Sequence, residues 1–219
     1  MKNKKIILLI MPLLLTSCQN NQKILYLGEP FLLQNSDLYM NLEEHFNQEI
    51  NHEFTSSNFF MKDFYNQLEK DALNLVTSNR ISEVLKQSNK IIFNVGNYEL
   101  LRLIEYKNYS FSYNSEVIKT SREMFDYYFH QSLDILVNYT QDIVIIPMYN
   151  PLLIKEEYRL ELNELINSYN KIIQDNCTEF NVKYVNIDKM SSFVYQDNHI
   201  SESGYDYLIK KIEQVYGSD

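Results

Sequence analysis

Short apolar runs alternate with longer segments of helical periodicity along most of the chain. The runs at 23–28, 52–56, 90–96, 142–148 and 182–187 are typical of strands. Apolar residues recur at helical spacing in the segments 38–50, 59–76, 80–87, 116–138, 154–177 and 205–216. This alternation predicts parallel βα units with helices on both faces of a sheet. We therefore expect an α/β fold with three layers, α/β/α, around a five-stranded parallel sheet.

Functional sites of such sheets lie at the carboxyl ends of the strands. That rule selects four places: Gly28-Glu29-Pro30, Thr55-Ser56-Ser57, Gly96-Asn97-Tyr98-Glu99 and the loop 191–203. The expected pocket residues are Gly28, Glu29, Pro30, Ser57, Gly96, Asn97, Tyr98 and Asn150.

Composition and charge limit the classes of protein to which the chain can belong. The chain has 219 residues, 45% of them hydrophobic, which is enough for one globular domain with a sizeable core. Its formal net charge of −9 disfavours nucleic acid as a partner, because nucleic-acid affinity depends on Lys and Arg that neutralise phosphates.

The first residues have the pattern of a targeting segment. Lys2, Lys4 and Lys5 precede an apolar run at 6–15, which is too short to span a membrane as a helix. The following Leu-Thr-Ser-Cys resembles the bacterial lipobox, in which the cysteine is lipidated; an ordinary secretory signal with a chance cysteine is the alternative. We expect residues 1–17 to be a lipoprotein signal peptide.

Cleavage there leaves a lipidated Cys18, a short tether at 18–22 and an α/β domain at 23–219. It removes three lysines and no acidic residue, so the net charge changes from −9 to −12. Two acyl chains are enough for stable anchoring, which predicts an extracytoplasmic protein on the outer face of a bacterial cell membrane. Cys177, the other cysteine, is expected to be a small apolar residue on a helix face.

Four segments, in order, resemble the sequence blocks of the SGNH (GDSL) hydrolase family. They are "LGEP" at 27–30, "IIFNVGNYEL" at 91–100, "IVIIPMYNPL" at 143–152 and "YQDNHISESGYDYLIKKI" at 195–212. The resemblance covers nearly the whole chain after residue 22. It implies the same fold and, in a complete member, ester hydrolysis by a Ser nucleophile, a His base and an Asp that orients the His. The oxyanion would be held by the Ser N–H, a Gly N–H and an Asn side chain.

Several of these functional residues are replaced in this chain. The nucleophile position is Pro30, which has neither a hydroxyl nor a backbone N–H. The Asn position is Tyr98 if Gly96 is kept in register, although Asn97 could serve if the turn shifts by one residue. The preceding Asp is replaced by Glu29.

The catalytic base and one oxyanion donor of the family pattern are only partly retained in this chain. His199 is retained as the implied base, with Asp197 two residues before it. Many members place the Asp three residues before the His, and that position is Gln196 here. The Gly of the second block falls near Ser56 or Ser57.

Other side chains could replace the missing nucleophile. Ser36 is better explained as a helix N-cap, and Ser56 and Ser57 as turn residues. Glu29 could act as a carboxylate nucleophile, or it could be a carboxylate in solvent or at a helix N-terminus.

The sequence gives no sign of a cofactor. Asp197 and His199 lack further ligands for a metal site, because His45, His52 and His130 are scattered along the chain. Three hypotheses remain: a non-hydrolytic binding or assembly module of the cell envelope with an unknown ligand or protein partner; an esterase or deacetylase acting on envelope glycans or lipids; and an unrelated flavodoxin-like or solute-binding lipoprotein. A strand order other than 2-1-3-4-5 would favour the third.

Overall fold

A computed structural model describes most of the chain after residue 22. The described residues are 23–29, 43–44, 46–56, 59–107, 115–150, 156–193 and 200–216, with the backbone alone at 104–107 and 156–159. The predicted signal peptide and tether therefore lie outside the described residues. No helix in the described part of the chain is long and apolar enough to cross a membrane.

Five parallel strands form one sheet. They are β1 (Lys23–Gly28), β2 (Ile50–Asn51), β3 (Ser88–Asn94), β4 (Ile143–Ile146) and β5 (Lys183–Tyr184). The order across the sheet is β2-β1-β3-β4-β5, and every neighbouring pair is parallel. The structure confirms the expected three-layer fold and the strand order 2-1-3-4-5.

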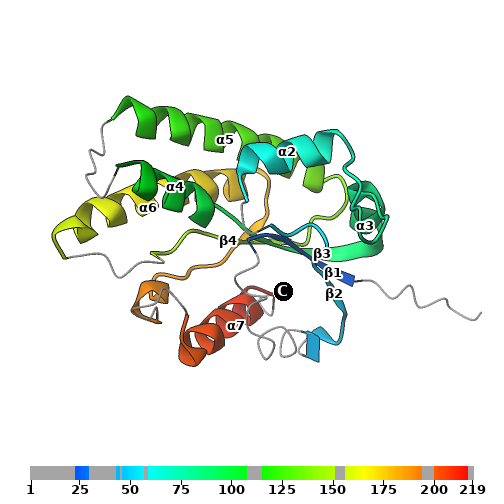
Figure 1. Cartoon of the computed structure of the whole chain (residues 1–219). Helices are drawn as coiled ribbons and strands as arrows, with labels where there is room; N and C mark the ends of the chain where they lie inside the picture. The colour runs from blue at the N-terminus through cyan, green and yellow to red at the C-terminus, as the bar shows by residue number, and fades with distance from the viewer. Residues whose placement is uncertain are drawn as a thin grey trace, which may run out of the picture.

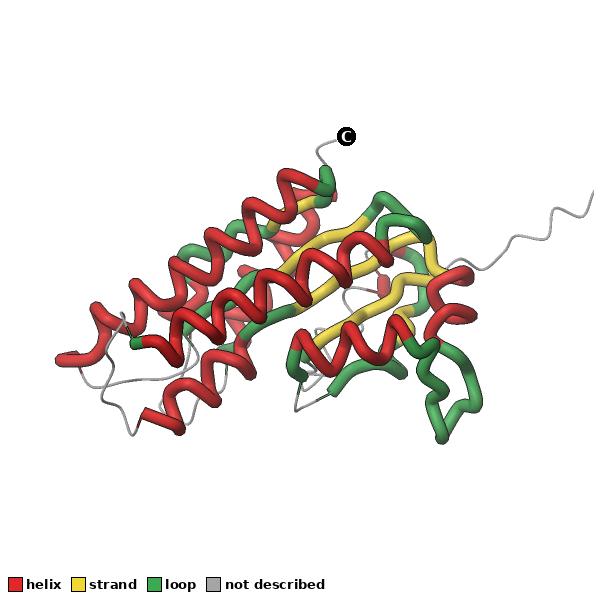
Figure 2. Tube along the Cα trace, turned by 90° about the horizontal axis from the view of Figure 1, so that it is seen from above, coloured by secondary structure: helices red, strands yellow, loops and turns green. Residues whose placement is uncertain are grey.

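Helices cover both faces of this sheet (Figure 1). One layer contains α2 (Met61–Glu69), α3 (Ile81–Gln87), α4 (Asn97–Lys107), α5 (Glu116–Leu136) and α6 (Glu156–Glu179). The opposite face is covered by α7 (Glu202–Tyr216), which follows a short 3-10 helix at Met190–Phe193. Figure 2, seen from above, shows the long helices of the first layer running roughly alongside the strands.

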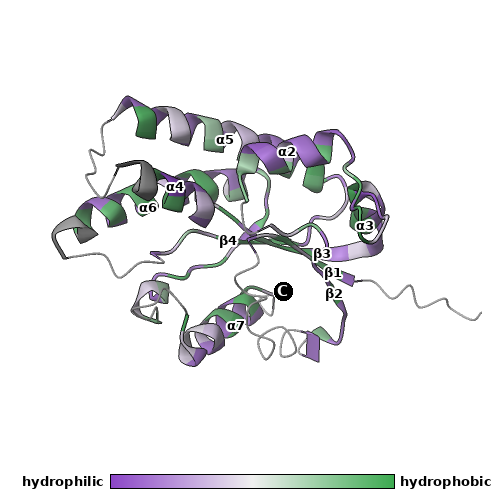
Figure 3. Cartoon of the chain, in the orientation of Figure 1, coloured by the Kyte–Doolittle hydropathy of each residue, from purple (hydrophilic) through white to green (hydrophobic). Residues whose placement is uncertain are grey.

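Alternate residues of the strands supply two separate cores, as the period of two in a strand requires. Leu25, Leu27 and Phe93 face the large helical layer, whereas Ile24 and Tyr26 face α7. The helices turn hydrophobic residues toward these cores, and Figure 3 shows hydrophobic and hydrophilic positions interleaved along α5 and α7. This burial on both faces explains why the strands are nearly continuous apolar runs.

Two predicted elements differ from the observed ones, and one observed helix was not predicted. The strand predicted at 52–56 is instead β2 at 50–51, followed by a single bridge between Thr55 and Gly28. The helix predicted at 59–76 ends at Glu69, because Asp71 has a φ of +49° and the chain turns back toward α3. Helix α4 was not predicted, although its first residues, Asn97 to Glu99, belong to one of the four expected strand-end places. In the segment 38–50, residues 43–44 and 46 are helical.

Candidate functional site

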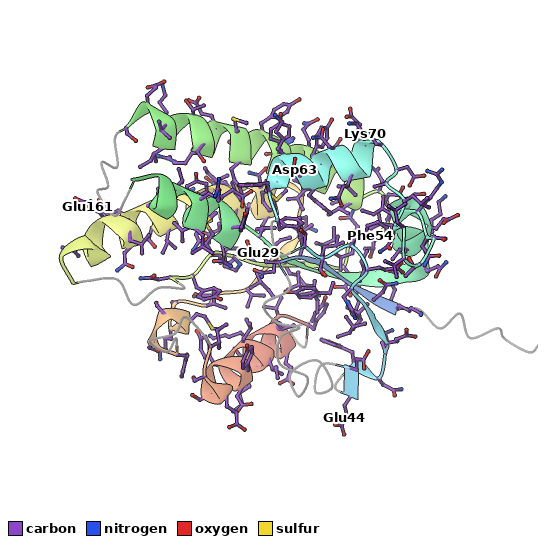
Figure 4. All side chains as sticks on the ribbon, in the orientation of Figure 1. Glu29, Glu44, Phe54, Asp63, Lys70 and Glu161 are labelled. Atoms are coloured by element: carbon purple, nitrogen blue, oxygen red, sulfur yellow. The ribbon has the colours of Figure 1, made fainter. Side chains whose placement is uncertain are left out.

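The carboxyl ends of β1, β3 and β4 bring most of the described candidate residues together. Gly28 and Glu29 end β1, while Gly96 to Tyr98 lead from β3 into α4. Asn150 follows β4 and is 9% exposed. Figure 4 shows Glu29 near the end of the sheet, next to α4. This is the edge at which parallel α/β sheets bind ligands.

Gly28 is required by the close approach of β1 and β3. Its φ is +98°, and a Cβ at this position would lie 1.8 Å from the carbonyl oxygen of Asn94. The Gly28 carbonyl accepts a 3.1 Å hydrogen bond from the Ser56 N–H. The Ser56 N–H is thus already used, which leaves Ser57 as the other expected oxyanion donor of that block.

Glu29 is a buried carboxyl group rather than a solvated one. Its side chain is 8% exposed, and Oε1 accepts a 2.7 Å hydrogen bond from the backbone N–H of Tyr98 in the first turn of α4. Burial raises the pKa of Glu29 from 4.5 to about 8, although the hydrogen bond from Tyr98 acts in the opposite direction. A mostly protonated carboxyl group is a poor nucleophile at neutral pH, so the geometry favours a role at the helix N-terminus.

Glu99 is a second buried carboxyl group; it belongs to the strand-end segment Gly96-Asn97-Tyr98-Glu99 but was not among the expected pocket residues. Its Oε1 accepts a 2.6 Å hydrogen bond from the Met61 N–H at the start of α2. Its Oε2 has no hydrogen-bond partner among the described residues. Burial raises the pKa of Glu99 to about 7. Its place in the first turn of a helix that follows a strand is the sequence signal that could have marked it.

Tyr98 and Asn97 play different parts at the expected oxyanion position. The Tyr98 ring packs edge-on against Phe60, with 4.7 Å between the ring centroids. Asn97 is 3% exposed, and its Oδ1 accepts a 3.1 Å hydrogen bond from the Tyr149 N–H. Asn97 Nδ2 faces the Glu29 carboxyl closely enough to oppose the rise of its pKa, although it makes no hydrogen bond of good geometry within the described part of the chain. Asn97 therefore presents its amide group to Glu29 at the end of β1.

Gly96 also holds a conformation that suits glycine. Its φ is +93°, and a Cβ there would lie 2.1 Å from the Met148 side chain. The Met148 backbone is fixed in turn by Asn170 of α6, which donates to its carbonyl at 2.8 Å and accepts from its N–H at 3.0 Å. The turn after β3 therefore packs closely against the end of β4, which Asn170 holds in place.

A groove of about 640 Å³ lies beside these residues, between α2, α4 and α5. Its walls are mostly apolar, with Phe60, Leu103, Met124 and Phe125 among the lining residues, and Glu99 also lines it. A second cleft of about 460 Å³ borders Asn150 on the side of α6, with several asparagines in its lining. The end of the sheet therefore has space for a ligand on two sides.

The remaining predicted site residues lie outside the described part of the chain. They are Cys18, Pro30, Ser57, Asp197 and His199, and the weighed alternatives Ser36, His45 and Gln196 also fall there. Within the described ranges, no group of three or more His, Cys, Asp or Glu side chains could hold a metal ion. Cys177 is buried at 2% exposure on α6, as expected from its sequence position.

No family model and no curated protein matches the chain. Among solved structures, a lipase from a goat rumen metagenome has 15% sequence identity and a TM-score of 0.66, over 89% of this chain and 97% of that chain.

Two further solved structures share this arrangement. An acetylxylan esterase from Geobacillus stearothermophilus, solved as a catalytic mutant, has 9% identity and a TM-score of 0.62, over 90% of this chain and 95% of that chain. A phospholipase A1 from Streptomyces albidoflavus has 9% identity and a TM-score of 0.59, over 89% of this chain and 99% of that chain. Identities this low show the fold alone. The chain has the SGNH-hydrolase type of fold that its sequence blocks predicted.

Proposed function

We propose that the chain is a non-hydrolytic binding or assembly protein of the bacterial cell envelope that keeps the fold of an esterase. The observation that carries the proposal is Pro30, which directly follows the Gly28-Glu29 turn at the end of β1. The resembling hydrolases have their Ser nucleophile at this position. Proline removes both the attacking hydroxyl and one backbone oxyanion donor.

The described residues at the ends of β1 and β3 also support this proposal. Tyr98 stands where the family has an oxyanion Asn, and its own N–H is used by Glu29. The Ser56 N–H is used by the Gly28 carbonyl. Loss of one oxyanion donor costs about 10²–10³ in rate, and loss of the nucleophile costs more. These losses together argue against ester hydrolysis by the family mechanism.

Lipidation at Cys18 is the second part of the proposal. The signal-like residues 1–17 and the Leu-Thr-Ser-Cys sequence support an anchor on the outer face of the membrane. Intact-mass measurement on protein extracted from membranes should show acyl chains at Cys18, and Cys18→Ser should move the protein to the soluble fraction. An unmodified Cys18 in protein from the native membrane would contradict the anchor but not the loss of hydrolysis.

A direct assay tests the loss of hydrolysis. The full chain in detergent is expected to hydrolyse p-nitrophenyl acetate no faster than its His199→Ala variant. A rate well above background that disappears in His199→Ala would show a working catalytic base and overturn the proposal.

A second candidate function is an esterase or deacetylase acting on envelope glycans or lipids with another nucleophile. The observation that favours it is the buried Asn97 side chain, whose Nδ2 group lies beside Glu29 at the expected oxyanion position and makes no hydrogen bond of good geometry among the described residues. Release of acetate from acetylated xylan, or of fatty acid from phospholipid vesicles, would support this candidate. Absence of both products, alongside an active esterase as control, favours the binding protein.

A further inference from the structure

The connection between α2 and α3 is a small, well-formed hairpin at residues 72–81. Leu73 and Arg80 form an antiparallel bridge, and the Ile81 N–H donates to the Ala72 carbonyl at 3.0 Å. At the tip, Asn74 Oδ1 accepts hydrogen bonds from the N–H groups of residues 76 and 77, at 2.8 and 3.2 Å. Such side-chain-to-backbone bonds fix the shape of a turn.

Polar side chains of the 72–81 hairpin bind Glu53, which lies just after the edge strand β2. Asn74 Nδ2 donates to the Glu53 carbonyl at 2.7 Å, and Asn79 Nδ2 donates to the Glu53 carboxylate at 3.1 Å. The Thr77 hydroxyl also donates to this carboxylate. Glu53 therefore gathers three polar side chains of the hairpin against the body of the domain.

The apolar residues of the hairpin point the other way. Leu75 is 88% exposed and Val76 is 92% exposed, and they are the most exposed large hydrophobic residues in the described part of the chain. Leu73 behind them is 47% exposed. A single exposed apolar residue needs no explanation. Here two adjacent ones are held out at a tip whose polar side chains are bonded to Glu53 and to the turn itself.

The hairpin lies at the end of the molecule where the chain enters β1. Lys23, the first residue of β1, is paired in register with Ser88, which directly follows α3. Figures 1 and 2 both place the α2–α3 connection at the same end as the start of β1. Figure 4 labels Lys70 on this side and Glu161 at the opposite end of the molecule.

We propose that Leu75 and Val76 insert into the bilayer when the chain is anchored at Cys18. The inference rests on the proposed anchor and adds a second contact to it. Cys18 precedes Lys23 by five residues, which span at most about 18 Å when extended. The anchored domain must therefore hold this end close to the membrane, where apolar side chains enter the boundary between head groups and acyl chains.

The contact would also orient the candidate site. The strands start at the end that carries the hairpin and finish at Gly28, Asn94 and Ile146. With the hairpin in the bilayer, the carboxyl ends of the strands face away from the membrane. The candidate site is then open to soluble or cell-wall ligands rather than to lipids of the same membrane.

Tryptophan fluorescence tests this contact without background, because the chain contains no Trp. Leu75→Trp is the probe. Leu160→Trp is the matched control, since Leu160 is also apolar and 76% exposed but lies next to Glu161 at the opposite end. The full chain is coupled through Cys18 to a maleimide lipid in phosphatidylcholine–phosphatidylglycerol vesicles. Cys177 does not compete, because it is buried and burial raises its pKa to about 12.

On coupling, the emission of Leu75→Trp should shift to the blue and be quenched by lipids with brominated acyl chains. The emission of Leu160→Trp should keep the wavelength of an exposed indole. If both variants stay equally exposed on the vesicles, or if brominated lipids quench them equally, the inference is wrong. Because coupling is chemical, this outcome does not depend on whether cells lipidate Cys18. The intact mass of protein from membranes decides that question separately.

Discussion

The carboxyl group of Glu29 accepts a 2.7 Å hydrogen bond from the backbone N–H of Tyr98, which joins the end of β1 to the start of α4. In α4, Glu99 repeats the arrangement with the Met61 N–H at the start of α2. Two buried carboxyl groups thus connect β1 to α4 and α4 to α2, beside the candidate groove. These contacts have the chemistry of helix capping rather than that of an attacking group.

Protonation of Glu29 should make stability depend on pH. Its pKa rises from 4.5 to about 8 on folding, so between these values the folded chain holds a proton that the unfolded chain has released. The free energy of unfolding must then fall as pH rises through this window, by at most about 1.4 kcal/mol per pH unit for one carboxyl group. Glu99, whose pKa rises from 4.5 to about 7, should also lower the free energy of unfolding as pH rises, over the narrower range between these two values.

In the Glu29→Gln variant, the part of this pH dependence of the free energy of unfolding that comes from Glu29 should be lost. Urea unfolding from about pH 5 to about pH 8 should show wild type losing stability relative to the variant as pH rises. Parallel curves for the two proteins across this range would contradict the assignment.

Removal of the Glu99 carboxyl group should destabilise the start of α2. The residue before α2, Phe60, provides no side-chain cap, and the Met61 N–H is bonded by Glu99 instead. We expect Glu99→Ala to lower the free energy of unfolding by about 1–2 kcal/mol, as the loss of a helix cap does. Glu99→Gln keeps an acceptor oxygen and should cost less. Equal losses in the two variants, measured by urea unfolding, would mean that the hydrogen bond is not the cause.

The two glycines at the strand ends should respond differently to alanine. In Gly28→Ala the new Cβ meets the Asn94 backbone, whereas in Gly96→Ala it meets the flexible side chain of Met148. Both positions have positive φ, which alone costs about 1–3 kcal/mol for a residue with a Cβ. We expect Gly28→Ala to lower the melting temperature more than Gly96→Ala. The reverse order in thermal unfolding would show that β1 and β3 can separate at this point.

The two cysteines should differ sharply in reactivity. Cys177 is 2% exposed, and burial raises its pKa to about 12, so its thiolate is scarce and shielded at neutral pH. An unlipidated chain treated with a thiol reagent should therefore be modified at Cys18 before unfolding and at both cysteines in urea. Mass spectrometry of peptides identifies the sites. Rapid labelling of Cys177 in the folded chain would indicate local opening of α6.

The fold could be predicted from the chain because its strands are buried on both faces and read as uninterrupted apolar runs. β1 was predicted with its observed bounds, and β3, β4 and β5 within a few residues. The 59–76 helix was predicted too long because Leu73, Leu75 and Val76 continue an apolar pattern. In the structure they belong to a hairpin, and hydrogen bonds to Glu53 determine its shape.

The candidate site was harder to predict because its chemistry depends on burial. Glu29 and Glu99 are ordinary charged residues in the sequence, and only the packing of α2 and α4 around them makes their carboxyl groups buried helix partners. Sequence spacing also left open whether Asn97 or Tyr98 stands at the oxyanion position. In the structure both residues meet Glu29: the Tyr98 backbone N–H donates to its carboxyl group, and the Asn97 side chain lies beside that group.

Pro30 is the residue on which the proposed loss of hydrolysis depends, because it stands where an esterase of this shape has its nucleophile. Intact-mass analysis after treatment with a fluorophosphonate tests this loss, for the full chain and for its Pro30→Ser variant. We expect no adduct on the natural chain. The Pro30→Ser variant should carry a single adduct on the introduced hydroxyl, which is lost again when His199→Ala is added. A stoichiometric adduct on any residue of the natural chain would show that a nucleophile is still present and that the proposed function is wrong.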